Sequence, residues 1–180
     1  MAWNDDFWKD QYQSKWKQSS QKEKAFKDFI TKKTGLILED YGLGAGTSSY
    51  LTGNARSHDK EKGDPDFKIV NTNIFIEVTG PLKYGVGFEE DLWIRPDKIE
   101  NAINHPDHDT FIAHRCENNN GIMWRIIHIN DDFKARYIRG EFEDVYPYIN
   151  HQREHYKAIN ASDGCIEDLN VLISYLKKDS

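Results

Sequence analysis

Hydrophobic and polar residues alternate through the stretch GDPDFKIVNTNIFIEVTG, residues 63 to 80. A period of two is typical of β-strands with one buried face. The apolar positions 67 and 69 predict one strand, and the apolar positions 74, 76 and 78 predict a second. Asn71 and Thr72 provide a two-residue turn between them. The stretch is therefore predicted to be a tight β-hairpin.

Two carboxylates fall on the polar face of this hairpin. Parity places Asp66, Lys68, Glu77 and Thr79 opposite the apolar face, and the two-residue turn sets Asp66 directly across from Glu77, with Cβ atoms about 5 Å apart. At about 4 Å and an effective dielectric constant near 20, two such charges repel by roughly 4 kcal/mol. We therefore expect a cation between them, and a hard ion such as Mg²⁺ takes carboxylate oxygens while keeping waters for a phosphate substrate. The alternative is a polar face in water, with Lys68 screening both acids.

The chain before the hairpin reads mainly as helix. Aromatic residues spaced four apart after an N-cap at Asn4 predict a first helix. Ser20 and Glu23 fit a capping box, which predicts a second helix or a kinked continuation that ends at Gly35. A strand follows, and the glycine-rich segment from Gly42 onward is predicted to be a loop.

After the hairpin, Pro96 opens a predicted helix over RPDKIENAINH, and DTFIAHRCE and GIMWRIIHI predict two strands joined by a turn at residues 118–121. Two further helices are predicted over residues 142–160 and 163–178. The fold class is α/β, with a central mixed β-sheet flanked by helices. We expect one domain over residues 1–180, with a core at about 20–129 and a helical C-terminal extension at about 142–178.

Composition narrows the class of protein. With 180 residues, 38% hydrophobic and 13% aromatic, the chain suits a globular domain. No apolar run approaches a membrane span and the first ten residues are polar and acidic, so we expect a soluble cytoplasmic protein without membrane contact. The net charge of −6 argues against nucleic-acid binding by the whole surface. Lysines concentrate in residues 9–33, however, as a basic stripe or a solvated helix face.

Zinc chemistry has two weak candidates. HQREH, residues 151–155, fits the inverted zinc-protease motif H-x-x-E-H if it is helical. Such a site also needs a third ligand and a large substrate cleft, and Glu167 is the nearest acid in the 25 residues that follow, so exposed helical histidines are the better interpretation. A second group matches no common zinc spacing; its members are His105, His108, His114 and Cys116. His114 is expected on a strand beside the hairpin, where it can line a cleft. Cys116 and Cys165 are expected to be buried thiols.

Pro65-Asp66 on one strand and Glu77-Val78-Thr79 on the next, within this order of elements, resemble the PD-(D/E)XK nuclease superfamily, the restriction-endonuclease-like fold. The resemblance covers about residues 20–129. It implies that Asp66 and Glu77 bind Mg²⁺, for which Mn²⁺ can substitute, and that Glu23 on the preceding helix is a further metal ligand.

Thr79 stands where the family has its lysine. The resemblance implies that the lysine comes from a neighbouring element, either Lys83 in the next loop or Lys98 on the next helix, and we prefer Lys98 because a helix positions a side chain better. Such a lysine orients water and stabilises negative charge on the phosphorane. Thr79 shares the face of Glu77 and can hold a water. Asp64 is expected to shape the turn.

The sequence thus predicts a metal-dependent endonuclease that hydrolyses phosphodiester bonds in double-stranded DNA, with a homodimer as the natural way to cut both strands. The alternative is a catalytically inactive nuclease-fold module that binds nucleic acid or a protein partner. Thr79 in place of the lysine and the acidic net charge favour this alternative.

Overall fold

A computed structural model describes residues 5–42, 63–80, 87, 89–119, 121–149 and 151–178, apart from the side chains of residues 5–19 and 118. Within these ranges the helices are α1 (Asp5–Thr34), α2 (Pro96–Asn104), α3 (Asp131–Ile138) and α4 (Leu169–Lys178). The strands up to the second helix are β1 (Leu38–Asp40), β2 (Phe67–Ile69), β3 (Ile74–Thr79) and β4 (Leu92–Ile94). The later strands are β5 (Asp109–Asn118), β6 (Gly121–His128), β7 (Glu143–Val145), β8 (Tyr148–Ile149), β9 (Gln152–Arg153), β10 (Tyr156–Ile159) and β11 (Ile166–Asp168).

A six-stranded sheet in the order β1-β2-β3-β5-β6-β11 forms the centre of the molecule. The pair β3–β5 is parallel and the other pairs are antiparallel, so the sheet is mixed as predicted. A parallel pair needs a crossover connection, and α2 lies within the one between β3 and β5. The predicted order of helix, strand, hairpin, helix, strand and strand is confirmed for α1 through β6, with β4 as an additional short strand before α2.

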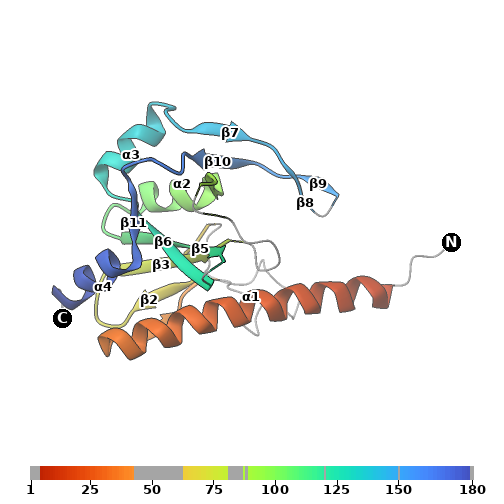
Figure 1. The fold of residues 1–180 in the computed structure, drawn as a ribbon, viewed down its shortest axis with the longest axis horizontal. Coiled ribbons are helices and arrows are strands. Elements are labelled where there is room, and N and C mark those ends of the chain that lie inside the picture. The colour runs from red at the N-terminus through yellow and green to blue at the C-terminus, as the bar shows by residue number, and fades with distance from the viewer. Residues whose placement is uncertain are drawn as a thin grey trace.

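Both faces of this sheet are covered by apolar side chains. On one face, Phe26 and Ile30 of α1 and Leu172 of α4 pack against the apolar side of the hairpin. On the other, Ile99 of α2 and Phe133 of α3 pack against residues of β5 and β6. Figure 1 shows α1 along one side of the sheet and α2 with α3 on the opposite side. The polar face of the hairpin therefore lies beneath helices and not in open water, which contradicts the alternative in which Lys68 screens two solvated acids.

The register of the hairpin is the one that the turn predicts. Phe67 pairs with Ile76 and Lys68 pairs with Phe75. Continuing this register by one residue sets Asp66 opposite Glu77. Asn71, at the first turn position, has φ = 64°, a conformation that asparagine tolerates better than most residues.

The N-terminal region is one helix of 30 residues, not two. It contains neither proline nor glycine, so nothing interrupts the backbone at Ser20. The predicted capping box is therefore wrong: Ser20 and Glu23 lie inside α1, and Glu23 shares the buried face of the helix with Phe26 and Ile30. The predicted end is confirmed, because Gly35 has φ = +73° and donates its N–H to Thr31.

The helix predicted over residues 142–160 is wrong. This region forms β7 to β10, where β10 joins β4 and β7 in a three-stranded sheet and β8 pairs with β9 at the tip of the arm that projects in Figure 1. Pro147, which cannot donate a helical hydrogen bond, and the β-branched and aromatic residues around it favour strands. Helix α3 was missed although Asn130 is a strong N-cap, whose side chain accepts the N–H of Phe133. The last predicted helix begins at Leu169, six residues later than expected, after strand β11.

Within the described part of the chain, no helix has the length and apolar character that a membrane crossing requires.

The position of Ser20 gives a test of the single long helix. Inside a helix, Ser20→Ala should raise stability by roughly 0.5 kcal/mol, because alanine has the better helix propensity. At an N-cap the same change would cost about 1 kcal/mol, as we expect for the control Asn130→Ala. Urea unfolding of the two variants measures both effects. A loss of stability in Ser20→Ala comparable to that in the control would contradict the continuous helix.

Candidate active site

Asp66 and Glu77 lie at the buried edge where strand β2 begins and β3 approaches its end. Each residue is 8% exposed. Oδ2 of Asp66 accepts a hydrogen bond of 2.8 Å from the backbone N–H of Val78, beyond the last residue of β3 that pairs with β2. The carbonyl of Asp66 accepts the N–H of Tyr41 after β1. Asp66 is thus hydrogen-bonded to β3 through its side chain and to the residue after β1 through its backbone. Its carboxylate accepts the N–H of Val78 in place of a backbone carbonyl of β2.

Lys98 reaches the pair from α2. Its Nζ donates to Oε2 of Glu77 at 2.9 Å and to the carbonyl of Asp64 at 2.9 Å. Pro96 begins this helix, so Lys98 lies in its first turn, beside the hairpin. The preference for Lys98 over Lys83 therefore has a geometric basis, whereas Lys83 lies outside the described residues.

The loop before Asp66 is tied to the same helix. The amide Nδ2 of Asn101 donates to Oδ1 of Asp64 at 3.0 Å. Gly63 has φ = +86°, and a Cβ at this position would lie 2.2 Å from the carbonyl oxygen of Asp97. The loop is packed directly on α2, so Asp64 serves the conformation of the loop, in line with its predicted role.

Helix α1 contributes a second lysine that the sequence did not single out. Nζ of Lys22 donates to the carbonyl of Gly80, directly after β3, at 2.9 Å. Gly80 has φ = +107° and packs against the backbone of Arg115. A Cβ at position 80 would lie 2.8 Å from the carbonyl oxygen of Arg115. Glu23, 9% exposed, is the neighbour of Lys22 on the helix and interacts electrostatically with Asp66. The site therefore combines three buried acids with lysines from two helices.

Burial and mutual repulsion hold both carboxylates far from their usual titration range. Burial, followed by the charge of Glu23, raises the pKa of Asp66 to about 6, against the opposing effect of Lys98. Burial, followed by the charge of Asp66, raises the pKa of Glu77 to about 8. Both shifts mean that ionising the two carboxylates together costs free energy in the protein without a bound cation.

The two lysines respond in opposite directions. Burial lowers the pKa of Lys98, but Glu77 and Asp66 outweigh burial and raise it overall. For Lys22 burial dominates, so its pKa is lowered despite the nearby Asp66 and Glu23. Lys98 is therefore the firmly charged partner of the acids.

Comparison with family models, curated proteins and solved structures gave no match to this chain.

The donor set fits a hard divalent cation held by two carboxylates. Among the described residues, the hydrogen bonds of the pair use Oδ2 of Asp66 and Oε2 of Glu77, which leaves Oδ1 and Oε1 for a ligand. Magnesium is commonly held by one or two carboxylates together with water and substrate phosphate. The described residues contain no cluster of three acidic, histidine or cysteine side chains with the geometry of a metal site. Glu23 as a direct metal ligand thus stays a prediction.

Thr79 and His114 occupy neighbouring strands. Thr79 ends β3, half-buried, and pairs in register with His114 on β5. His114 is only 3% exposed, and its Nδ1 lies 3.0 Å from the carbonyl oxygen of Arg115. Burial lowers the pKa of His114 to about 4, so the ring is neutral at physiological pH. The expectation that His114 lines a cleft is wrong, because the ring is packed inside the sheet.

The zinc alternatives lose their geometric basis. Residues 151–155 form a turn and strand β9, with His151 at φ = 65°, so the motif H-x-x-E-H does not lie on a helix. Nε2 of His155 lies 2.6 Å from Oδ1 of Asp144. The rings of His105 and His108 stack with centroids 4.6 Å apart. These histidines take part in local ring packing and hydrogen bonding.

The raised pKa values make a prediction about stability without metal. Below about pH 4.5 the carboxyl of Glu77 is protonated in the folded and the unfolded chain, and its stabilising contribution is complete. As the pH rises toward about 8 the unfolded chain releases the proton first, so the contribution is lost. Glu77→Gln, which keeps an oxygen for Lys98, should remove this loss and be more stable than the wild type by several kcal/mol at about pH 8.

Urea unfolding in EDTA at about pH 5 and about pH 8 measures the difference. The control is Glu39→Gln, an exposed acid on β1 of the same sheet. An equal fall of stability with pH in the wild type and in Glu77→Gln would rule out Glu77 as a group that is protonated in the folded state.

Proposed function

We propose that the protein is a metal-dependent endonuclease that hydrolyses phosphodiester bonds in DNA. The observation that carries the proposal is the buried pair Asp66 and Glu77 in facing positions, with the ammonium group of Lys98 2.9 Å from Glu77. Carboxylates arranged to share a cation, beside a lysine, are the equipment for hydrolysing a phosphate ester. The order of elements and the mixed sheet around this pair support a restriction-endonuclease-like fold.

Each side chain has a distinct role in the proposed reaction. Oδ1 of Asp66 and Oε1 of Glu77 would hold Mg²⁺, and a bound Mg²⁺ neutralises the phosphate and lowers the pKa of the attacking water. Ion binding to ionised carboxylates releases the proton that Glu77 otherwise keeps, so binding should strengthen as the pH rises. Lys98 would stabilise the charge that develops on the phosphorane. The hydroxyl of Thr79, next on the same face as Glu77, would position a water.

The first test removes charge without removing shape. Asp66→Asn and Glu77→Gln should each abolish Mg²⁺-dependent cleavage of plasmid DNA, because an amide does not replace a carboxylate as a ligand for a hard ion. EDTA should abolish cleavage by the wild type, and added Mg²⁺ or Mn²⁺ should restore it. Glu39→Gln is the matched control.

Undiminished cleavage by either amide variant would remove the assignment. A wild type that shifts DNA in a gel but never cleaves it with Mg²⁺ or Mn²⁺ would instead identify a binding module.

The second test concerns the displaced lysine. Lys98→Ala should lower the cleavage rate by about 10²- to 10³-fold, as expected for loss of one group that stabilises transition-state charge. Adding Thr79→Lys in the same chain restores a cation on the face of Glu77 and should recover part of the loss. Lys24→Ala, an exposed lysine of α1, is the control. A rate in Lys98→Ala equal to that of the wild type would show that Lys98 serves only to neutralise Glu77.

A further inference from the structure

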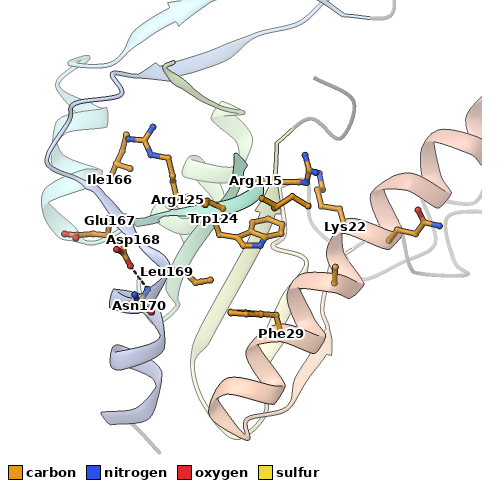
Figure 2. A pocket seen from close by; sticks show the side chains of 14 residues that line it. Lys22, Phe29, Arg115, Trp124, Arg125, Ile166, Glu167, Asp168, Leu169 and Asn170 are labelled. Atoms are coloured by element: carbon orange, nitrogen blue, oxygen red, sulfur yellow. Dashed lines mark hydrogen bonds between the residues drawn. The ribbon is translucent and has the colours of Figure 1, made fainter. Parts of the chain in front are cut away.

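A cavity of about 840 Å³ lies on the α1 face of the central sheet, between α1, β6 and the start of α4. Figure 2 shows Lys22 and Arg115 together at one end, Trp124 in the middle and Phe29 below it. The volume is within the range of about 300 to 1,000 Å³ that is typical of small-ligand sites. It suits one nucleotide, whereas a paired duplex is too wide for it.

Lys22 joins this cavity to the candidate active site. Its side chain lines the cavity, and its Nζ binds the carbonyl of Gly80, directly after β3. The charges of Asp66 and Glu77 act on the same ammonium group. A strand whose scissile phosphate lay at Asp66 would have to pass Lys22 at the end of β3 to place an adjoining nucleotide in the cavity.

The cationic end of the cavity suits a phosphate. Lys22 uses one of its three donors on Gly80, and the guanidinium group of Arg115, which also contacts Glu117 at 3.5 Å, lies at the same end of the cavity. Their charges act on each other, since Arg115 contributes to the lowered pKa of Lys22. An anion between the two would relieve this repulsion. The acid Asp168 on the opposite wall is engaged at the start of α4, where its Oδ1 accepts the N–H of Asn170.

The part of the wall that Ile122, Met123 and Trp124 form suits a base. The indole of Trp124 is held from the core side by Phe26, with ring centroids 4.9 Å apart at 64°, and its outer side borders the cavity. Ile122 and Met123, also on this wall, are 57% and 44% exposed. An aromatic ring beside cationic donors is the arrangement by which proteins bind single-stranded nucleic acid.

We propose that this cavity binds an unpaired nucleotide next to the cleaved bond, with its phosphate on Lys22 and Arg115 and its base against Trp124. The inference rests on the proposed nuclease function and narrows its substrate to DNA that offers a single-stranded or extruded nucleotide. In a duplex, extrusion of that nucleotide costs a few kcal/mol. Single-stranded DNA should therefore bind more tightly than the same sequence in a duplex.

The experiment measures binding in EDTA, apart from catalysis. The probes are a fluorescein-labelled oligothymidylate, its duplex with oligoadenylate, and inorganic polyphosphate as a competitor that carries charge without bases. Trp124→Leu should weaken oligothymidylate binding by roughly 5- to 150-fold, the equivalent of one stacked base, and leave polyphosphate binding unchanged. Trp93→Leu, an exposed tryptophan on β4, is the control.

Charge variants test the phosphate end. Lys22→Gln should weaken both ligands and reduce the dependence of log K on log salt by about 0.7, the value for one phosphate contact with a single strand. Lys24→Gln, exposed on the same helix, should change neither ligand. Because Trp124 also packs on Phe26, the exposed Met123→Glu provides a second variant, which should weaken oligothymidylate binding. Val171→Glu, at a separate smaller cavity, is its control.

Unchanged oligothymidylate binding in Trp124→Leu and Met123→Glu would overturn the inference, as would equal weakening of oligothymidylate and polyphosphate by Trp124→Leu. A change of the sedimentation coefficient in Met123→Glu with unchanged DNA binding would make this face a contact between two copies of the chain, which also overturns it. Cleavage that depends on Asp66 together with unchanged binding would refute the cavity alone. The predicted binding series without any cleavage would refute the nuclease alone.

Discussion

Glu77 is placed in a strand whose two faces are both covered by apolar side chains, opposite a second buried acid. Two ionised carboxylates in this position repel each other and have lost most of their hydration, which is why their pKa values rise to about 6 and about 8. One salt bridge from Lys98 does not cancel this cost, since the pKa of Glu77 stays raised in its presence. In the absence of metal this cost is avoided while Glu77 keeps a proton, and a bound cation would replace that proton, which is the physical basis of the proposed metal site.

The surrounding fold enforces the encounter. The pairing of β2 with β3 ends at Phe67, so the N–H of Val78 has no backbone partner on β2. It donates instead to the carboxylate of Asp66, and this hydrogen bond of 2.8 Å holds the carboxylate at the edge of the strand. The crossover through α2 then lays Lys98 and Asn101 over the same edge. The parallel pair β3–β5 requires a crossover connection, and the helix in that crossover carries Lys98 to the acids.

What the sequence predicted correctly depends on short-range regularities. A period of two and a two-residue turn fix which residues of the hairpin face each other, so Asp66 and Glu77 were found without tertiary information. The failures depend on context. Ser20 and Glu23 fit the capping-box pattern, but this pattern marks a helix start only where the preceding residues are not helical. No proline or glycine interrupts residues 5–34, so Ser20 lies inside α1. Residues 142–160 contain apolar spacings compatible with a helix, but β10 pairs with β4, a strand that lies more than 60 residues earlier in the chain.

The two lysines near the acids show most clearly which site residues can be predicted from the sequence and which cannot. Thr79 in place of a lysine looks like a lost function when the strand is considered alone. In the folded protein two lysines from other elements lie near this strand: Lys98 of α2 contacts Glu77, and Lys22 of α1 contacts the carbonyl of Gly80. Lys98 could be inferred, because Pro96 marks the start of a helix after the hairpin and a helix positions a side chain better than a loop. Lys22 could not, because its position depends on how a 30-residue helix packs across the sheet. Under the proposed nuclease function, Lys98, which contacts Glu77, would serve the chemistry, and Lys22, which borders the cavity, would serve substrate binding.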